Sequence, residues 1–351
     1  VGLEGLPETS QPPVLSLFRR FSAPVTWDAG QNVDDLFVLF AGDNDAFARW
    51  DAGQQLMLHW IELAEKGRFK LVKEDIDALH SVISDESLDP AMVAYLMALP
   101  SEAYIAETRK SYDPVAIHNG REQVLSEVAE ALNEDFKACY ERLNVPAEYQ
   151  PAPADMARRS LKNLALSYWA RASSDGIEAA KAQFNSADNM TDQMAALRVL
   201  VTCGDEAEAQ EALNAFYEQW KHDSLVVNQW LTVQCGSSRL GSPEHIEKML
   251  EHEAFDWRNP NKVRSVIGAF ANQALCHFHS ENGRGYRLLA DAVIRLNASN
   301  PQIASRLLTP LTRWKRLVPS QSHLMKAELQ RIMDSGSLSK DVYEVVSKSL
   351  V

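Results

Sequence analysis

The stretch that decides the fold reads DPVAIHNGREQVLSEVAEALNEDFKACYERL, residues 113–143. Asp113 is a residue type that caps helix N-termini, and Pro114 suits the first helical position, where a backbone N–H has no partner anyway. From Val115 to Leu143, apolar residues recur at spacings of three and four, which predicts a long amphipathic helical run. The sequence from Asp34 onward is predicted to consist of such segments.

The same helix-start signal, a capping residue followed by proline, recurs later in the chain. Asn259-Pro260 precedes the apolar run Val263 to Ala271, and Asn300-Pro301 precedes Ile303 to Leu308. Short connections favour antiparallel packing of consecutive helices, and many such pairs in series form a curved α-solenoid. The predicted fold class is therefore all-α, a superhelical array of antiparallel helix pairs with no fixed repeat period.

Residues 1–32 differ from the remainder of the chain. Pro7, Pro12, Pro13 and Pro24 punctuate this segment, and Val14–Val25 has the short apolar and aromatic runs typical of a strand. We therefore expect a short β remnant and linker in residues 1–32, and a helical domain in residues 33–351.

Composition narrows the classes of function. The 351 residues carry a formal net charge of -13, spread along the chain, which disfavours a nucleic-acid partner. No apolar run approaches the roughly 20 residues that a membrane helix needs, and no signal peptide is recognisable. The four cysteines form no CxxC pair and are expected to be buried free thiols, so a cytoplasmic location is predicted.

A zinc-peptidase motif is absent from the sequence. That chemistry needs His-Glu-x-x-His on one helix, so that two imidazoles reach the metal from one face beside a general base. The His252-Glu253 pair is followed by Ala254, Phe255 and Asp256, so the second histidine is missing. No catalytic residue and no metal ligand is therefore assigned in this chain.

Weaker candidates for functional residues remain, and each of them also has a purely structural interpretation. His277 and His279, with Glu281 beyond them, are a weak metal-binding signal, and histidines fixed by hydrogen bonds are the alternative. Gly283 and Gly285 are expected to supply unusual backbone angles in this corner. Cys139 with a distant histidine resembles a thiol nucleophile only loosely, and a buried inert cysteine is the alternative.

Several segments resemble the C-terminal region of bacterial aminopeptidase N, in the order and spacing of that family. They are Phe21-Ser22-Ala23-Pro24-Val25, Arg49-Trp50-Asp51-Ala52, Asp113-Pro114, Asn189-Met190-Thr191-Asp192, Asn259-Pro260-Asn261-Lys262-Val263-Arg264-Ser265, Phe278-His279-Ser280-Glu281-Asn282-Gly283, and Asn300-Pro301-Gln302-Ile303-Ala304-Ser305-Arg306-Leu307. The resemblance covers nearly the whole chain.

The resemblance implies a non-catalytic part of a gluzincin-type zinc alanyl aminopeptidase, which removes N-terminal residues from peptides. The first residues would end a small β-sandwich, and the helical domain would cap the active site and restrict access to peptides and small substrates. Zinc would be bound by an upstream catalytic domain of the same polypeptide, and this chain alone would be inactive. The alternative is a stand-alone α-solenoid that binds a protein or peptide in its concave face.

Three side chains match family positions that face bound ligand or line the channel. Gln302 and Arg306 are four residues apart after a capped helix start, which places them on one helix face. Arg306 offers a planar fork of donors to a carbonyl or carboxylate, and a solvated arginine is the alternative. Arg264 is a third substrate-binding candidate, with a structural salt bridge as its alternative. Pro310 is expected to end or kink the helix that carries Arg306.

Overall fold

The computed structural model describes residues 13–25, 27, 30–146 and 148–351. Helices succeed one another along nearly all of this part of the chain, and the described residues contain no strand. Their one β-type pairing is an isolated parallel bridge between Tyr112 and Leu317. The all-α prediction is confirmed.

The first half of the array contains η1 (Arg19–Phe21), α1 (Val33–Gly42), α2 (Ala46–Glu65), α3 (Lys73–Ile83), α4 (Pro90–Met97), α5 (Glu102–Glu107), α6 (Pro114–Ala131), α7 (Asn133–Leu143), α8 (Pro153–Ala172), α9 (Ser174–Ser186) and α10 (Met190–Cys203). The second half contains α11 (Glu206–Trp220), α12 (Ser224–Cys235), α13 (Pro243–Glu251), α14 (Pro260–Val263), η2 (Arg264–Gly268), α15 (Ala269–Gln273), α16 (Leu275–Phe278), α17 (Arg284–Asn297), α18 (Pro301–Leu307), α19 (Thr309–Thr312), η3 (Trp314–Arg316), α20 (Pro319–Met333) and α21 (Lys340–Leu350).

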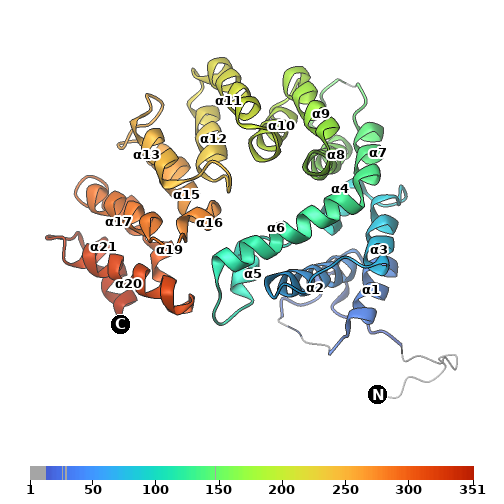
Figure 1. Ribbon diagram of the computed structural model, residues 1–351, viewed down its shortest axis with the longest axis horizontal. Coiled ribbons are helices and arrows are strands. Elements are labelled where there is room, and N and C mark those ends of the chain that lie inside the picture. Colours follow the sequence, from blue (N-terminus) through green and yellow to red (C-terminus); the bar gives the residue numbers. More distant parts are fainter. Residues whose placement is uncertain (1–12, 26, 28–29, 147) are drawn as a thin grey trace.

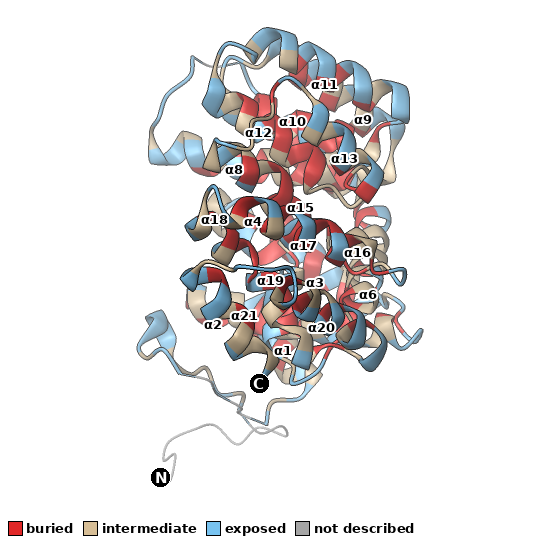
Figure 2. Ribbon diagram, turned by 90° about the vertical axis from the view of Figure 1, so that its left-hand side faces the viewer, coloured by how far each residue is buried: buried red, intermediate tan, exposed pale blue. Residues whose placement is uncertain are grey.

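Consecutive helices pack against each other through most of the chain, as in α1 with α2, α7 with α8, and α9 with α10. Figure 1 shows the resulting curve, which runs from α1–α6 through α7–α13 to the C-terminal helices. Residues coloured as buried gather where the helices face one another, and exposed residues gather on the outer turns (Figure 2). The predicted solenoid is confirmed.

The predicted β remnant is wrong where the structure describes it. Residues 13–25 contain no strand but a short turn, η1, at which Phe18, Arg20 and Phe21 adopt positive φ. A strand needs a ladder of hydrogen bonds to a neighbouring strand, whereas the Arg20 N–H here bonds the carboxylate of Asp45, at 3.0 Å. Residues 1–12 of the expected remnant lie outside the described residues.

The run from Val115 to Leu143 forms two helices rather than one. Leu132 leaves helical geometry at φ -111° and ψ 23°, so α6 ends at Ala131 and α7 begins at Asn133. The acidic Glu134 and Asp135 then occupy the first turn of α7, where carboxylates stabilise a helix N-terminus. The apolar period alone did not reveal this break. The predicted starts at Asp113, Asn259 and Asn300 are confirmed, because each of these side chains caps a helix that opens with proline.

Two regions far apart in the sequence meet at one junction, which we call the clasp. It consists of Arg316 of η3 with Ala106, Arg109 and Tyr112. The Arg316 guanidinium donates to the carbonyl oxygens of Ala106, at 2.8 Å, and Arg109, at 2.7 Å. It also lies 5.4 Å from the centroid of the Tyr112 ring. The clasp therefore joins the segment between α5 and α6 to the segment between α19 and α20.

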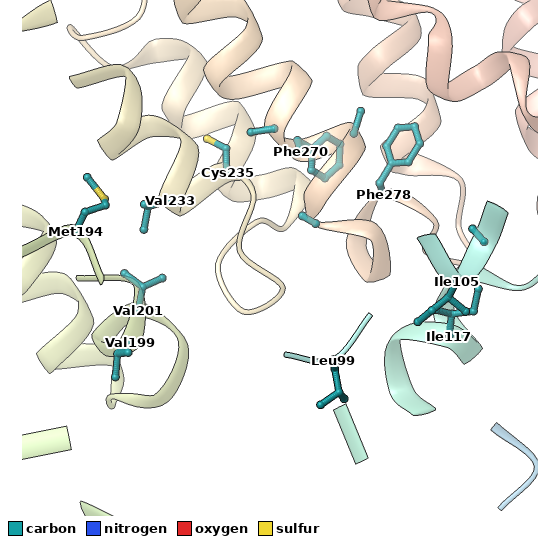
Figure 3. Packing of buried hydrophobic residues seen from close by; sticks show 14 of the residues in the cluster. Leu99, Ile105, Ile117, Met194, Val199, Val201, Val233, Cys235, Phe270 and Phe278 are labelled. Carbon is teal, nitrogen blue, oxygen red and sulfur yellow. The ribbon is translucent and has the colours of Figure 1, made fainter. Parts of the chain in front are cut away.

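The core is continuous across this junction. Helix α16 packs on α6, and the buried side chains there include Ile117 and Phe278. Figure 3 shows both residues, with Ile105 and Phe270 nearby. The α6 region and the C-terminal part of the array therefore share one apolar interior.

The corner at Gly283 and Gly285 uses its glycines in two different ways. Gly283 has φ +65°, as expected, but Gly285 does not adopt positive φ. A Cβ on Gly285 would lie 2.3 Å from the Phe278 carbonyl oxygen and 2.7 Å from its Cα. The expectation was therefore wrong for Gly285, whose hydrogen atom permits close backbone approach instead.

A substitution at Gly285 tests this close approach. We expect Gly285→Ala to lower the free energy of unfolding by about 3 kcal/mol, since backbone atoms must shift to admit the methyl group. Gly268→Ala is the matched control, because the Cβ built there meets nothing nearer than Arg264 Cβ, at 3.7 Å. Urea denaturation of both variants measures the difference. Equal losses would contradict the explanation.

Candidate functional site

A groove of about 860 Å³ lies among α12, the α14–α15 segment and α18–α19. Its lining residues include Leu225, Asn228, Gln229, Thr232, Asn261, Arg264, Ser265, Gln273, Ile303, Arg306, Leu307 and Thr309. The lining contains two charged residues, Arg264 and Arg306, and no aspartate or glutamate. In a chain with a net charge of -13, this groove is a local positive site.

Arg306 reaches the groove because of how α18 begins and packs. The Asn300 side chain accepts a hydrogen bond from the Ile303 N–H, at 3.3 Å, and fixes the helix start. Ile303 and Leu307 are buried, while Gln302 and Arg306 are exposed on the opposite face. Gln302 therefore lies one turn from Arg306, but outside the residues that line the groove.

Pro310 limits the length of this helix. Helix α18 ends at Leu307, and Pro310 occupies the first turn of α19. The expectation that Pro310 ends or kinks the helix is confirmed. The break leaves Arg306 in the last turn, where a cation is favoured by the helix dipole.

Arg264 lies at the start of η2, a π-helical turn between α14 and α15. Such turns insert an extra residue and often occur at functional sites, because they redirect side chains. The exposed Arg264 guanidinium donates a hydrogen bond to the Asn261 side-chain oxygen. In the part of the chain that the structure describes, neither Arg264 nor Arg306 forms a salt bridge, so both charges are available to an anion.

Helix α12 contributes polar groups that the sequence did not single out. Asn228 lines the groove, and its Oδ1 atom is buried with no hydrogen-bond partner in the structure. A buried acceptor without a partner is costly, so a donor on a bound ligand would stabilise it. Leu225 is 72% exposed and adds apolar surface at the same groove. Because α12 is distant in sequence from α18, only the fold brings these residues together.

The other histidine candidates have structural partners. His252 Nδ1 accepts from the Ala254 N–H, at 3.1 Å, while the carboxylate of Glu253 accepts from the Tyr217 hydroxyl, at 2.9 Å. His277 Nε2 lies 2.7 Å from the Ser238 carbonyl oxygen, and His279 Nδ1 lies 2.8 Å from the Tyr286 hydroxyl. The imidazoles of His277 and His279 thus bond to different groups.

The described residues contain no group of three or more His, Cys, Asp or Glu side chains arranged to hold a metal ion. The cysteines there are free thiols, of which Cys139 and Cys235 are buried and Cys203 and Cys276 are half-buried. Burial raises the pKa of Cys139 to about 11, which favours the inert thiol. Among the described residues, no helix is both long and apolar enough to cross a bilayer.

Comparisons with known proteins agree with this architecture. A family described as "Domain of unknown function (DUF3458_C) ARM repeats" matches residues 33–351. Aminopeptidase N of Caulobacter vibrioides is 34% identical over 97% of this chain and 40% of its own length. Aminopeptidase N of Escherichia coli is 35% identical over 96% of this chain and 39% of its own length.

A solved structure extends the likeness to the fold. The crystal structure of Legionella pneumophila aminopeptidase A in complex with aspartic acid has a TM-score of 0.87 and 30% identity. It covers 97% of this chain, which spans 41% of that protein. The chain thus spans about 40% of the length of the relatives that it matches. This chain belongs to the DUF3458_C family of ARM-repeat domains and matches a C-terminal part of aminopeptidase N.

Proposed function

We propose that this chain is the non-catalytic C-terminal domain of a zinc-dependent aminopeptidase that removes N-terminal residues from peptides. Its groove would form part of the substrate cavity, cap the active site and admit only peptides and small substrates. The likeness to aminopeptidase N supports the parent activity. The observation that carries the role of this domain is a groove whose charged lining residues are Arg264 and Arg306 alone.

The groove offers a peptide three kinds of contact. The Arg306 guanidinium can hold a peptide C-terminal carboxylate through two parallel hydrogen bonds, and Arg264 adds a second positive charge. Gln302, one turn away on the same face, can both donate to and accept from a longer peptide. Asn228 Oδ1 can accept from a backbone N–H. The site therefore suits an anionic, extended ligand.

The zinc of the parent enzyme does not fit the residues described here. No cluster of His, Cys, Asp or Glu in them suits a metal ion, so the metal would belong to an upstream catalytic domain. That domain is the partner that we propose for this chain, in the same polypeptide and in the cytoplasm. The domain boundary after residue 32 is part of the same proposal, and α1 begins at Val33.

Arg306 provides the test of substrate binding. In the parent enzyme, we expect Arg306→Ala to lower kcat/KM for peptides with a free carboxylate by about 10- to 100-fold, since a hydrogen bond to a charged group contributes about 1.5–3 kcal/mol. Single-residue amides, which lack that carboxylate, should lose much less. Arg258→Ala is the matched control, because this side chain is 90% exposed and lies outside the groove. An unchanged ratio between the two substrate types would contradict the proposal.

A stand-alone peptide-binding scaffold is the second candidate, since the curved array is itself a binding architecture. The size of the native polypeptide separates the two. An antibody to this chain should detect a polypeptide more than twice the 39.2 kDa of the present sequence in a denaturing gel of cell extract. A band at 39.2 kDa alone would instead support the scaffold.

A further inference from the structure

A second cavity, of about 340 Å³, lies beside the groove described above, and we call it the polar cavity. Side chains of α5, α6, α10 and α12 line it, together with the last residue of α15. Thr232 and Gln273 line both the polar cavity and the groove, so the two adjoin. Arg264 and Arg306 line the groove but not the polar cavity. The polar cavity is therefore a separate candidate for a binding site.

Glu102 brings a carboxylate oxygen without a partner to the polar cavity. Its Oε1 atom lies 2.8 Å from His118 Nδ1. Its Oε2 atom is buried and has no hydrogen-bond partner among the described residues. The last torsion of a glutamate side chain is soft, so a small rotation can present this oxygen to the cavity. Because a buried acceptor without a partner is costly, an ammonium group that donates to it would be stabilising.

Arg198 supplies a free positive charge at the same cavity. It lies in α10 and is exposed. Within the described part of the chain it forms neither a hydrogen bond nor a salt bridge. The other charged lining residues are already paired, since His118 contacts Glu102, and Arg121 lies 3.7 Å from a carboxylate oxygen of Glu122. An acceptor on Glu102 and a free cation on Arg198 therefore face one cavity.

A smaller cavity of about 170 Å³ also includes Glu102 in its lining. The arginine of that cavity, Arg313, already lies 4.0 Å from a carboxylate oxygen of Glu107. Apolar side chains such as Ile117 and Leu275 cover other parts of its wall. The unpaired arginine and the greater volume both favour the polar cavity as the place where a ligand with two charges binds.

We propose that the polar cavity binds free α-amino acids. The ammonium group of the ligand donates to the Glu102 carboxylate, and the ligand carboxylate accepts from the Arg198 guanidinium. The hydroxyl groups of Thr202 and Ser238, which also line the cavity, suit a short polar side chain. Free amino acids are also what an aminopeptidase releases. That connection with turnover rests on the proposed function, whereas the binding itself does not.

Methyl NMR tests the binding and locates it. L-Threonine is the probe, added to the folded chain with labelled methyl groups of valine, leucine and isoleucine. Val201 and Val233 line the polar cavity, and we expect their signals to shift in a saturable way. Ile303 and Leu307 line the groove, and their signals should stay in place. The absence of saturable shifts, or shifts confined to the groove, would overturn the proposal.

Two analogues of the probe test the two charges separately. L-Threoninamide has no carboxylate, and N-acetyl-L-threonine has no ammonium group. Each should bind at least about tenfold more weakly than L-threonine, because each has lost one hydrogen bond between charged groups. Equal affinities for the three compounds would show that the cavity does not recognise an amino acid by its charges.

Variants assign each charge to a residue. Arg198→Ala should weaken L-threonine binding at least about tenfold but leave the affinity for L-threoninamide unchanged, since that ligand has no carboxylate to lose. Glu102→Gln should weaken L-threonine but not N-acetyl-L-threonine. Arg258→Ala is the matched control, an exposed arginine outside the polar cavity. Because Arg198 is exposed, its replacement leaves the fold intact, and parental affinity in Arg198→Ala would refute the assignment.

Two further arginine variants exclude the neighbouring cavities. If Arg306→Ala weakens L-threonine binding in place of Arg198→Ala, the amino acid occupies the groove. If Arg313→Ala does so, the ligand occupies the smaller cavity. Either result would overturn the proposal while leaving the proposed role of the groove in peptide binding untouched.

Discussion

Replacement of Lys162 by methionine is expected to lower the free energy of unfolding by about 3–5 kcal/mol, the usual result of removing one partner from a buried ion pair. Lys162 and Asp192 are only 4% and 6% exposed, and their charged atoms lie 2.7 Å apart. The Asp192 carboxylate also accepts from Asn163, at 2.9 Å, and Asn189, at 3.2 Å. These amides orient the carboxylate but do not neutralise it.

Urea denaturation of the variant measures this loss. Lys181→Met is the matched control, because Lys181 bridges Glu178 and Glu208 at the protein surface, where such pairs contribute about 1 kcal/mol or less. A double variant with Asp192→Leu should regain stability relative to Lys162→Met, since no buried charge then remains unpaired. Similar losses for Lys162→Met and Lys181→Met would show that the buried pair contributes little.

Acid should destabilise the chain through His279. Burial lowers the pKa of His279 to about 3, and Arg313 adds to this effect. The unfolded chain binds the proton near the usual pKa of about 6.5. The folded state therefore opposes protonation, so its stability is complete above pH 6.5 and declines as the pH falls towards 3. The full loss is roughly 5 kcal/mol, at 1.36 kcal/mol for each pKa unit.

A variant without this imidazole isolates the effect. We expect His279→Gln to be less stable than the parent at neutral pH, because the contact with the Tyr286 hydroxyl changes. Its stability should nevertheless fall less steeply between about pH 6.5 and 4, since no buried imidazole remains to be protonated. His323→Gln, at an exposed position of α20, should keep the parental slope. Parallel curves for His279→Gln and the parent would refute this account.

Local signals in the sequence predicted the helices well. Capping residues followed by proline located three helix starts, because both features act within a few residues of the chain. The break at Leu132 escaped prediction, since the apolar period continues across it. The expected strand at Val14–Val25 failed for a related reason. Apolar and aromatic residues favour a strand only where another strand pairs with it, and the described residues provide none.

The candidate site was only partly accessible to sequence reasoning. A shared helix face linked Gln302 with Arg306, but the fold was needed to place Arg264 in the same groove. No sequence motif identified Asn228 as a candidate. It became one because the fold buries its Oδ1 atom without a hydrogen-bond partner. The role of these residues in substrate binding stays a prediction. Contacts across helices distant in sequence are set by packing, which no local pattern encodes.

The clasp also constrains the order in which this protein folds. Arg316 and Ala106 are separated by 210 residues, and closing so long a flexible loop costs about 5 kcal/mol of chain entropy. Contacts between neighbouring helices close short loops and therefore cost much less chain entropy. These helix pairs should form first and shorten the effective loop as they stack. The contact of α16 with α6 then arises late, when the C-terminal helices reach α6. The hydrogen bonds from Arg316 to the carbonyl oxygens of Ala106 and Arg109 should therefore be among the last to form, and amide exchange at this junction would report the completion of folding.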